Sequence, residues 1–218
     1  MLNNELFELG KKYQTDKVTH FFLHHYDNAF NHLRDKHLRL LEIGVYKGSS
    51  IRMWRDYFPN AEIHCIDINH VDLSDLKNVT MHIANCDSKL ELKNLASKLG
   101  EFDIIIDDGG HSMKQQQNAF EIFWKNLKSK GTFVMEDLHT SINFLYPGHN
   151  EEKQPTTYDL LMSLLKKESF FSNYISKESY EDLSKTVDKV DIIWSKKIIS
   201  NDKLKPFNAS ITSFITKE

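Results

Sequence analysis

Five short apolar runs, separated by amphipathic stretches, constrain the fold of this chain more than any other feature of its sequence. The runs cover residues 38–44, 62–68, 79–84, 102–107 and 131–137. They are too apolar for strands that face water on one side, so we interpret them as strands of a sheet covered on both faces. Strands that alternate with helices predict an α/β fold with a doubly wound, mostly parallel sheet.

Two of the intervening segments have the apolar spacing of helices. Residues 49–59 place their large apolar side chains on one face and end at a proline. Residues 112–131 begin at Ser112, a typical capping residue, and we expect this helix to continue as far as Gly131.

The length of 218 residues is sufficient for one large core, and we expect a single domain. Residues 1–35 are predicted to form two helices that flank or cover a core made by residues 36–218. In the last third, residues 156–171 have a helical pattern, and two segments are predicted to add antiparallel strands at a sheet edge, residues 190–200 and 209–216.

Acidic and basic residues nearly balance in this chain. The 28 lysines and arginines against 31 aspartates and glutamates give a formal charge of −3, so no positive field favours nucleic acid or an anionic membrane. No run approaches the roughly 18 apolar residues of a membrane span. We therefore expect a cytoplasmic protein with no nucleic-acid or membrane partner.

The turn after the first expected strand suggests a binding site for a nucleoside. Glu42, Gly44 and Gly48 lie there, and Asp67 falls at the end of the second strand, where a carboxylate accepts hydrogen bonds from ribose hydroxyls. The phosphate-binding pattern GxGxxG is absent, and Glu42 would repel a pyrophosphate. The pattern favours a nucleoside with a cationic or amino-acid tail, although a glycine-containing turn without a ligand explains the glycines equally well.

The third expected strand also ends in polar residues. Asn85 and Asp87 follow it, and either could accept a hydrogen bond from the adenine amino group. An Asx turn or a helix cap accounts for them equally well.

Two acidic pairs end the fourth and fifth expected strands. Asp107 and Asp108 follow one strand, and Glu136 and Asp137 follow the other. In a doubly wound sheet these strand ends face one crevice, where four carboxylates would repel one another unless a cation balanced them. Oxygen ligands favour Mg²⁺ or Mn²⁺. The alternative is that these residues are ordinary loop carboxylates and helix caps.

Several motifs together resemble a known family. The ExGxxxG turn with an acidic residue after the second strand resembles class I S-adenosylmethionine-dependent methyltransferases, which implies a Rossmann-like sheet. Residues 50–68, 107–111 and 135–141 look like the metal-dependent macrolide-sugar and related sugar O-methyltransferases. Residues 15–26 are similar to their N-terminal TDK…H…Y segment. Gln14 and Phe22 depart from that pattern, which has glycine and tyrosine at these positions.

The resemblance implies which residues form the site. The expected cofactor site comprises Thr15, Asp16, Lys17, His20, Tyr26, Glu42, Gly44, Gly48, Ser49, Asp67, Ile68, Asn85, Asp87 and Asp107. The expected metal ligands are Asp108, Glu136 and Asp137. Because neighbouring residues on a strand point to opposite faces, we expect Asp107 to anchor the amides of the following glycine turn or to orient a water molecule.

Catalysis in this interpretation needs a metal ligand and a base beside the metal. The expected catalytic residues are therefore Asp108, as a ligand, and a histidine, as the base. His111 is expected to be that base, because an imidazole with a pKa of about 6.5 accepts a proton near neutrality. His139 is the reserve base or an acceptor-site residue. A hydrogen-bonded structural role is the alternative for each, since the chain has 11 histidines.

The function that follows is transfer of a methyl group from S-adenosylmethionine to a sugar hydroxyl, with Mg²⁺ or Mn²⁺. We expect a small-molecule sugar, a nucleotide-activated sugar, or a natural-product or capsular and other surface-polysaccharide sugar as the acceptor. The alternatives are a phenolic or catechol-like acceptor, or a nucleoside-binding protein without catalysis. The sequence leaves open whether the chain forms homo-oligomers.

Overall fold

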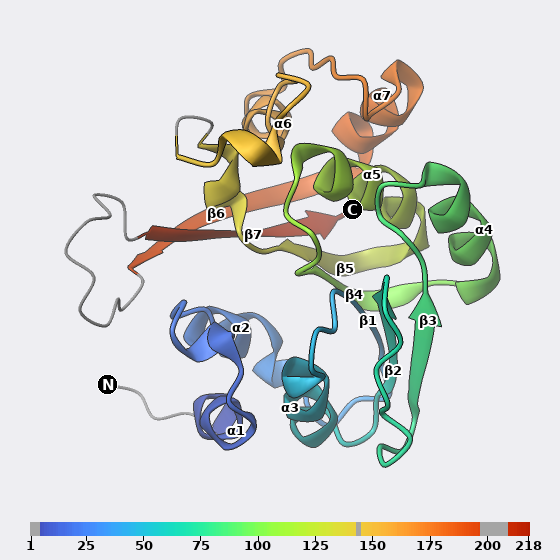
Figure 1. Cartoon of the computed structure of the whole chain (residues 1–218), viewed down its shortest axis with the longest axis vertical. Helices are drawn as coiled ribbons and strands as arrows, with labels where there is room; N and C mark the ends of the chain where they lie inside the picture. The colour runs from blue at the N-terminus through green and yellow to red at the C-terminus, as the bar shows by residue number, and fades with distance from the viewer. Residues whose placement is uncertain (1–4, 143–144, 197–208) are drawn as a thin grey trace.

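A computed structural model describes residues 5–142, 145–196 and 209–218 of the protein. A seven-stranded sheet forms its centre (Figure 1). The strands lie in the order β3-β2-β1-β4-β5-β7-β6. Their bounds are β1 Arg39–Ile43, β2 Glu62–Asp67, β3 Val79–Ile83, β4 Phe102–Asp107, β5 Leu127–Met135, β6 Val187–Lys196 and β7 Ala209–Lys217. This order confirms the predicted doubly wound, Rossmann-like sheet.

The strand pairings place a ligand-binding crevice in the middle of the sheet. Strands β1 to β5 pair in parallel, and the chain reverses its direction of winding between β1 and β4. In sheets of this kind ligands bind beyond the carboxyl ends of the strands at such a switch point.

The antiparallel edge is also confirmed. Strand β7 pairs antiparallel with β5 and with β6. The strand expected over residues 190–200 begins earlier, at Val187, and its expected residues 197–200 lie outside the described residues.

Helices cover both faces of the sheet, which explains why the strands are apolar throughout (Figure 1). Leu40 and Ile104 belong to the core on one face, whereas Leu41 and Ile105 belong to the core on the other. The helices on the first face are α1 Glu5–Tyr13, α2 Leu23–Phe30 and α3 Ser49–Tyr57. Those on the second face are α4 Lys89–Leu99, α5 Met113–Phe123, α6 Thr157–Lys166 and α7 Lys177–Thr186. The two helices predicted within residues 1–35 are confirmed as α1 and α2.

The predicted helix over residues 112–131 is correct at its start and wrong at its end. Ser112 caps α5, and its hydroxyl accepts a hydrogen bond from the Gln115 amide at 3.2 Å. The helix stops at Phe123, a short 3-10 turn follows, and β5 begins at Leu127. Gly131 therefore lies inside a strand, where a Cβ atom would approach the Asp103 carbonyl oxygen to 3.0 Å. Its lack of a side chain serves close strand packing, not a helix end.

Within the described part of the chain, we find no helix that has both the length and the apolar character needed to cross a membrane.

Candidate functional site

A cavity of about 680 Å³ opens at the carboxyl ends of β1, β2 and β4, next to the switch point. The segment between α1 and α2 contributes one wall. Nine of the residues predicted from the sequence line this cavity: Thr15, Asp16, Gly44, Ser49, Asp67, Ile68, Asn85, Asp108 and His111. We call it the cofactor cavity, because it brings together the turns from which a nucleoside site was predicted.

Asp67 ties two walls of the cofactor cavity together. Its carboxylate accepts hydrogen bonds from the amides of Val45 at 2.8 Å, Tyr46 at 3.1 Å and Asn69 at 2.9 Å. Burial alone would raise the pKa of Asp67, but these amides lower it below its usual value. The group is therefore ionised at neutral pH and places a negative charge in the cavity wall. Its predicted contact with a ribose stays a prediction.

The two glycines of the first turn have packing reasons of their own. Gly44 has φ of 94°, and a Cβ atom there would lie 2.0 Å from the Asp108 carbonyl oxygen. Gly48 has φ of 77°, and its Cβ would meet Leu73 at 2.7 Å. Gly44 also lines the cavity, whereas Gly48 does not. The interpretation as a tight turn therefore accounts for Gly48 without a ligand.

The loop after β3 contributes one of its two predicted residues to the cavity. Asn85 lines it, and its side-chain oxygen also accepts a hydrogen bond from the Asp87 amide at 2.9 Å, as in an Asx turn. The Asp87 carboxylate accepts a hydrogen bond from Gln115 at 2.9 Å, and Asp87 is not among the lining residues. Cys86 lies in the cavity wall between them, and burial raises the pKa of its thiol to about 12.

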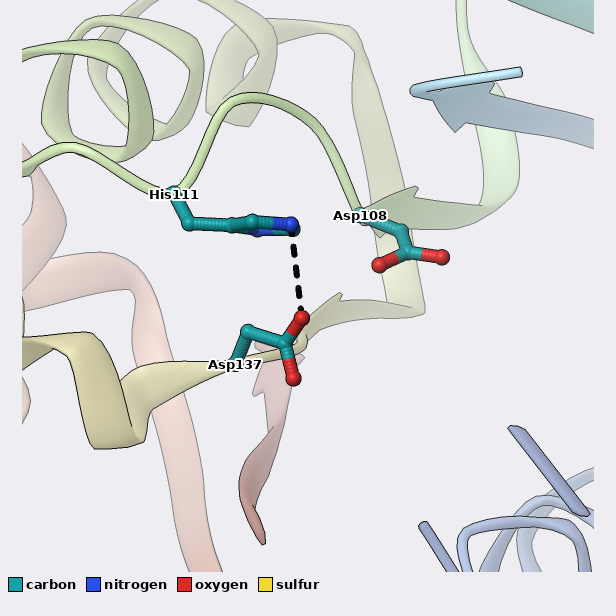
Figure 2. A group of neighbouring side chains, drawn as sticks. All are labelled: Asp108, His111 and Asp137. Carbon is teal, nitrogen blue, oxygen red and sulfur yellow. Dashed lines mark ion pairs between the residues drawn. The ribbon is translucent and has the colours of Figure 1, made fainter. Parts of the chain in front are cut away.

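Asp108 and His111, which line the cavity, come together with Asp137, which is not among its lining residues (Figure 2). Each offers a ligand atom, and these atoms lie within 4.8 Å of one another. The chain turns sharply at two of them, since φ is 59° at His111 and 55° at Asp137. Nε2 of His111 lies 3.3 Å from Oδ2 of Asp137. The two carboxylates suit Mg²⁺ or Mn²⁺ with water in the remaining positions, and the imidazole lies beside them.

Asp137 is surrounded by imidazoles. Ring nitrogens of His20, His111 and His139 lie 3.3, 3.3 and 3.5 Å from its carboxylate oxygens. Burial would raise the pKa of Asp137, but these histidines together lower it well below its usual value. Asp137 thus remains a carboxylate, as a metal ligand must be. His20, which we predicted in the cofactor site, and His139 both contact this carboxylate.

A second group of charges lies directly behind the cavity. The ammonium group of Lys17 lies 2.5 Å from the carboxylate of Asp108, 2.6 Å from that of Glu136 and 3.4 Å from that of Glu42. Tyr26 donates a hydrogen bond to the same Glu136 oxygen. We call these five residues the Lys17 cluster. Of them only Asp108 lines the cofactor cavity, although Lys17, Tyr26 and Glu42 were predicted to contact the cofactor.

Electrostatics in the Lys17 cluster follow from burial. Burial would lower the pKa of Lys17, but the three carboxylates raise it well above its usual value. Burial raises the pKa of Glu42 to about 7, and it also raises the pKa of Glu136 well above its usual value. Because Glu136 faces Lys17 and Tyr26, it does not belong to the group formed by Asp108, His111 and Asp137. Its role as a metal ligand stays a prediction.

Asp107 has the anchoring role expected from its position on β4. Its carboxylate accepts a hydrogen bond from the Gly109 amide at 3.2 Å, which holds the turn that leads to His111. Burial raises the pKa of Asp107 to about 8. Asp107 is not among the residues that line the cavity.

Several residues near the site were not predicted from the sequence. Gln14 lines the cavity with φ of 56°, a conformation that glycine adopts more readily, which accounts for the glycine of the family pattern at this position. Tyr146 lies edge-on to His139 with ring centres 5.2 Å apart. Tyr146 and His149 also meet edge-on, with ring centres 5.9 Å apart. The only signal for these two was an aromatic residue and a histidine within a loop. The remaining lining residues that we did not predict are Tyr13, Ile43, Val45, Tyr46, Lys47, Ser50, Ile66, Asn69, Ala84, Cys86, Gly109, Gly110 and Gln115.

Comparison with known proteins agrees with this geometry. Residues 41–138 match a family described as a methyltransferase domain. The chain is 35% identical over 178 residues to mycinamicin VI 2''-O-methyltransferase of Micromonospora griseorubida. That match covers 74% of this chain and 43% of the relative. The chain is 33% identical over 172 residues to 8-demethyl-8-(2-methoxy-alpha-L-rhamnosyl)-tetracenomycin-C 3'-O-methyltransferase of Streptomyces olivaceus, with 74% and 44% covered. The chain thus spans less than half the length of the curated relatives it matches.

A solved structure is similar along nearly the whole chain. It is the MycE methyltransferase from the mycinamycin biosynthetic pathway in complex with Mg, SAH and mycinamycin VI. The match has a TM-score of 0.76 and 26% sequence identity, and it covers 99% of this chain and 55% of that one.

Proposed function

This chain belongs to the class I S-adenosylmethionine-dependent methyltransferases, and from that premise we propose that it transfers a methyl group to a sugar hydroxyl with the help of a divalent metal. One observation carries the proposal. Asp108, His111 and Asp137 meet at the end of a cavity whose other walls contain Asp67 and Asn85. A group suited to hold a metal and a histidine suited to act as a base therefore adjoin a nucleoside-sized cavity, which supports metal-assisted methyl transfer to a hydroxyl.

In this proposal the cofactor cavity holds S-adenosylmethionine. Asp67, Ile68 and Asn85 would contact the nucleoside, and the end near Asp108 would receive the cationic sulfonium. The ionised carboxylate of Asp67 in the wall supports a ligand with a positive charge.

The residues present fit a divalent metal. Asp108 and Asp137 each offer a carboxylate oxygen, and these atoms lie within 4.8 Å of each other, close enough to share one ion. Asp108 and Asp137 would hold the ion, and Glu136 is our third proposed ligand. When bound, such an ion stabilises negative charge on an acceptor oxygen beside it.

His111 is the proposed general base. Its Nδ1 atom is buried, so Nε2 is the ring nitrogen that faces the site, 3.3 Å from Asp137. Asp137 lies beside the ring and can hold its orientation. Nε2 would take the proton of the acceptor hydroxyl while the acceptor oxygen attacks the methyl carbon. The bond between that carbon and the sulfonium sulfur would break, and S-adenosylhomocysteine would leave with the electron pair.

The acceptor that we propose is a sugar with two neighbouring hydroxyls, because chelation by both would fix which oxygen reacts. The relative from Streptomyces olivaceus supports a sugar, since its name places the methylated position on a rhamnosyl group. Within this class, a nucleotide-activated sugar and the sugar of a surface polysaccharide or natural product are the acceptors to try first.

The test is a methyl-transfer assay with labelled S-adenosylmethionine on such sugars, with Mg²⁺ or after chelation. We expect turnover only with metal, and loss of turnover in His111→Ala while binding of S-adenosylhomocysteine persists. His32→Ala, which removes an exposed histidine, is the matched control. Transfer to catechols alone would contradict the sugar acceptor, and cofactor binding without transfer to any acceptor would contradict catalysis.

A further inference from the structure

Lys17 is unusual among the basic residues of this protein. In the described part of the chain no other lysine or arginine is buried, and its side chain has no exposed surface. A fully buried ammonium group is stable only where carboxylates surround it, as three do here.

Two of those carboxylates are the ones that we propose as metal ligands. Asp108 and Glu136 lie 2.5 and 2.6 Å from the ammonium group, closer than Glu42 at 3.4 Å. Lys17 and a divalent ion would therefore draw on the same negative charge. The ammonium group and the ion would repel each other at such short range. The carboxylates would therefore bind the ion more weakly in the presence of the lysine charge than without it.

Other contacts fix the backbone at these two residues without Lys17, and one more reaches the Glu136 carboxylate. The backbone amide of Asp108 donates to the Ile43 carbonyl at 2.8 Å, and that of Glu136 donates to the Asp107 carbonyl at 2.9 Å. Tyr26 donates a hydrogen bond to the Glu136 carboxylate. The distinctive contribution of Lys17 is thus its charge.

We propose that Lys17 is a built-in counter-ion of the metal site, which neutralises Asp108 and Glu136 and thereby sets a weaker affinity for the divalent ion. The inference rests on the proposed metal-dependent function. It assigns Lys17 to the metal site as a positioning residue, in place of the cofactor contact expected from the sequence.

The test replaces Lys17 by methionine, which has a similar length and no charge. Mn²⁺ binding to the full chain is measured by the loss of the paramagnetic resonance signal of free Mn²⁺, and thermal unfolding is followed with and without Mn²⁺. We expect Lys17→Met to bind Mn²⁺ at least about tenfold more tightly than the wild type. Without Mn²⁺ the variant should melt lower than the wild type, and Mn²⁺ should raise its melting temperature by more.

Two controls separate charge from structure. Tyr26→Phe removes a neutral donor to the same Glu136 carboxylate and should leave Mn²⁺ affinity within about twofold of the wild type, because no charge changes. Lys12→Met removes an exposed lysine of the same N-terminal region, which pairs with Asp56 at 2.7 Å, and should have no effect on Mn²⁺ binding.

The outcomes distinguish this inference from the proposed function. If the wild type binds no Mn²⁺, the proposed metal dependence itself fails. If the wild type binds Mn²⁺ and Lys17→Met binds it equally or more weakly, only the role of Lys17 is overturned. A variant that stays unfolded even in saturating Mn²⁺ also contradicts the inference, because the ion could not then replace the lysine charge.

Discussion

The cofactor cavity and the Lys17 cluster meet at Asp108, yet they are built in opposite ways. The cavity consists of loops at strand ends, with half-exposed side chains such as Asp67 and Asn85 and with backbone amides that face it or hold its walls. The Lys17 cluster consists of four titratable charged side chains and Tyr26, and all of them except Asp108 are almost entirely buried. The cavity therefore depends on backbone conformation, whereas the cluster depends on the balance of its charges.

This difference determines how each region should respond to mutation. A substitution in the cavity wall removes one contact with a ligand and leaves its neighbours hydrated. Removing a charged member of the cluster leaves buried charges without partners, so its effect reaches the other charged members.

The largest effect is expected where the two regions meet. Asp108→Asn removes one carboxylate of the proposed metal site and should lower the rate of methyl transfer by roughly 10³-fold or more, because positive charge could no longer be held beside the acceptor oxygen. Binding of S-adenosylhomocysteine, measured by calorimetry, should change little. Asp75→Asn, at an exposed aspartate that pairs with Arg52, is the control. Full activity in Asp108→Asn would show that the cluster does not serve catalysis.

The backbone dependence of the cavity predicts the next effect. Gly44→Ala should lower the free energy of unfolding by about 3 kcal/mol, since it combines a left-handed residue with a steric clash. The added Cβ would lie 2.0 Å from the Asp108 carbonyl oxygen, on rigid backbone. Gly148→Ala is the matched control, because nothing lies within 4 Å of its Cβ position. Equal denaturation midpoints for the two variants would mean that the turn relaxes more easily than the structure indicates.

The same contrast explains how much could be predicted from the sequence. The sheet, its covered faces and much of the cavity followed from apolar runs and from polar residues at strand ends, because these signals are local. Asp67, Asn85 and Asp108 lie in the cavity wall for that reason. The end of α5 was placed too late, since Leu127 continues the apolar spacing of a helix although it begins β5.

The Lys17 cluster could not be predicted, because its contacts join residues far apart in the sequence. Lys17 and Glu136 are 119 positions apart, and no local pattern indicates that they pair. The motif in residues 15–26 marked Lys17 and Tyr26 as functional without saying which groups they contact. Their direction toward Glu136 is a property of tertiary packing.

A mutation inside the cavity should leave the cluster intact. Asp67→Ala removes the carboxylate that bridges β2 and the first turn, so binding of S-adenosylhomocysteine should weaken roughly 30-fold, the value of lost hydrogen bonds to a charged group. Mn²⁺ affinity should remain that of the wild type. The backbone amides that donate hydrogen bonds to Asp67 all belong to residues outside the Lys17 cluster. Weakened Mn²⁺ binding in this variant would mean that the two regions are coupled beyond their shared residue.

The smallest effect is expected beyond both regions, at Tyr146. This half-buried residue contacts His139 and does not line the cofactor cavity. Burial and the charge of Asp137 both raise the pKa of its hydroxyl. Tyr146 thus lies close to the proposed metal group but outside the cavity assigned to the cofactor, where an aromatic ring is suited to contact the apolar face of a sugar. Tyr146→Ala should raise KM for the acceptor roughly five- to tenfold, with S-adenosylhomocysteine and Mn²⁺ affinities unchanged. Phe171→Ala, at an aromatic residue that is 67% exposed, is the control. If Tyr146→Ala instead weakens binding of S-adenosylhomocysteine, the cofactor extends past Asp137, and the acceptor must approach from another side of the site.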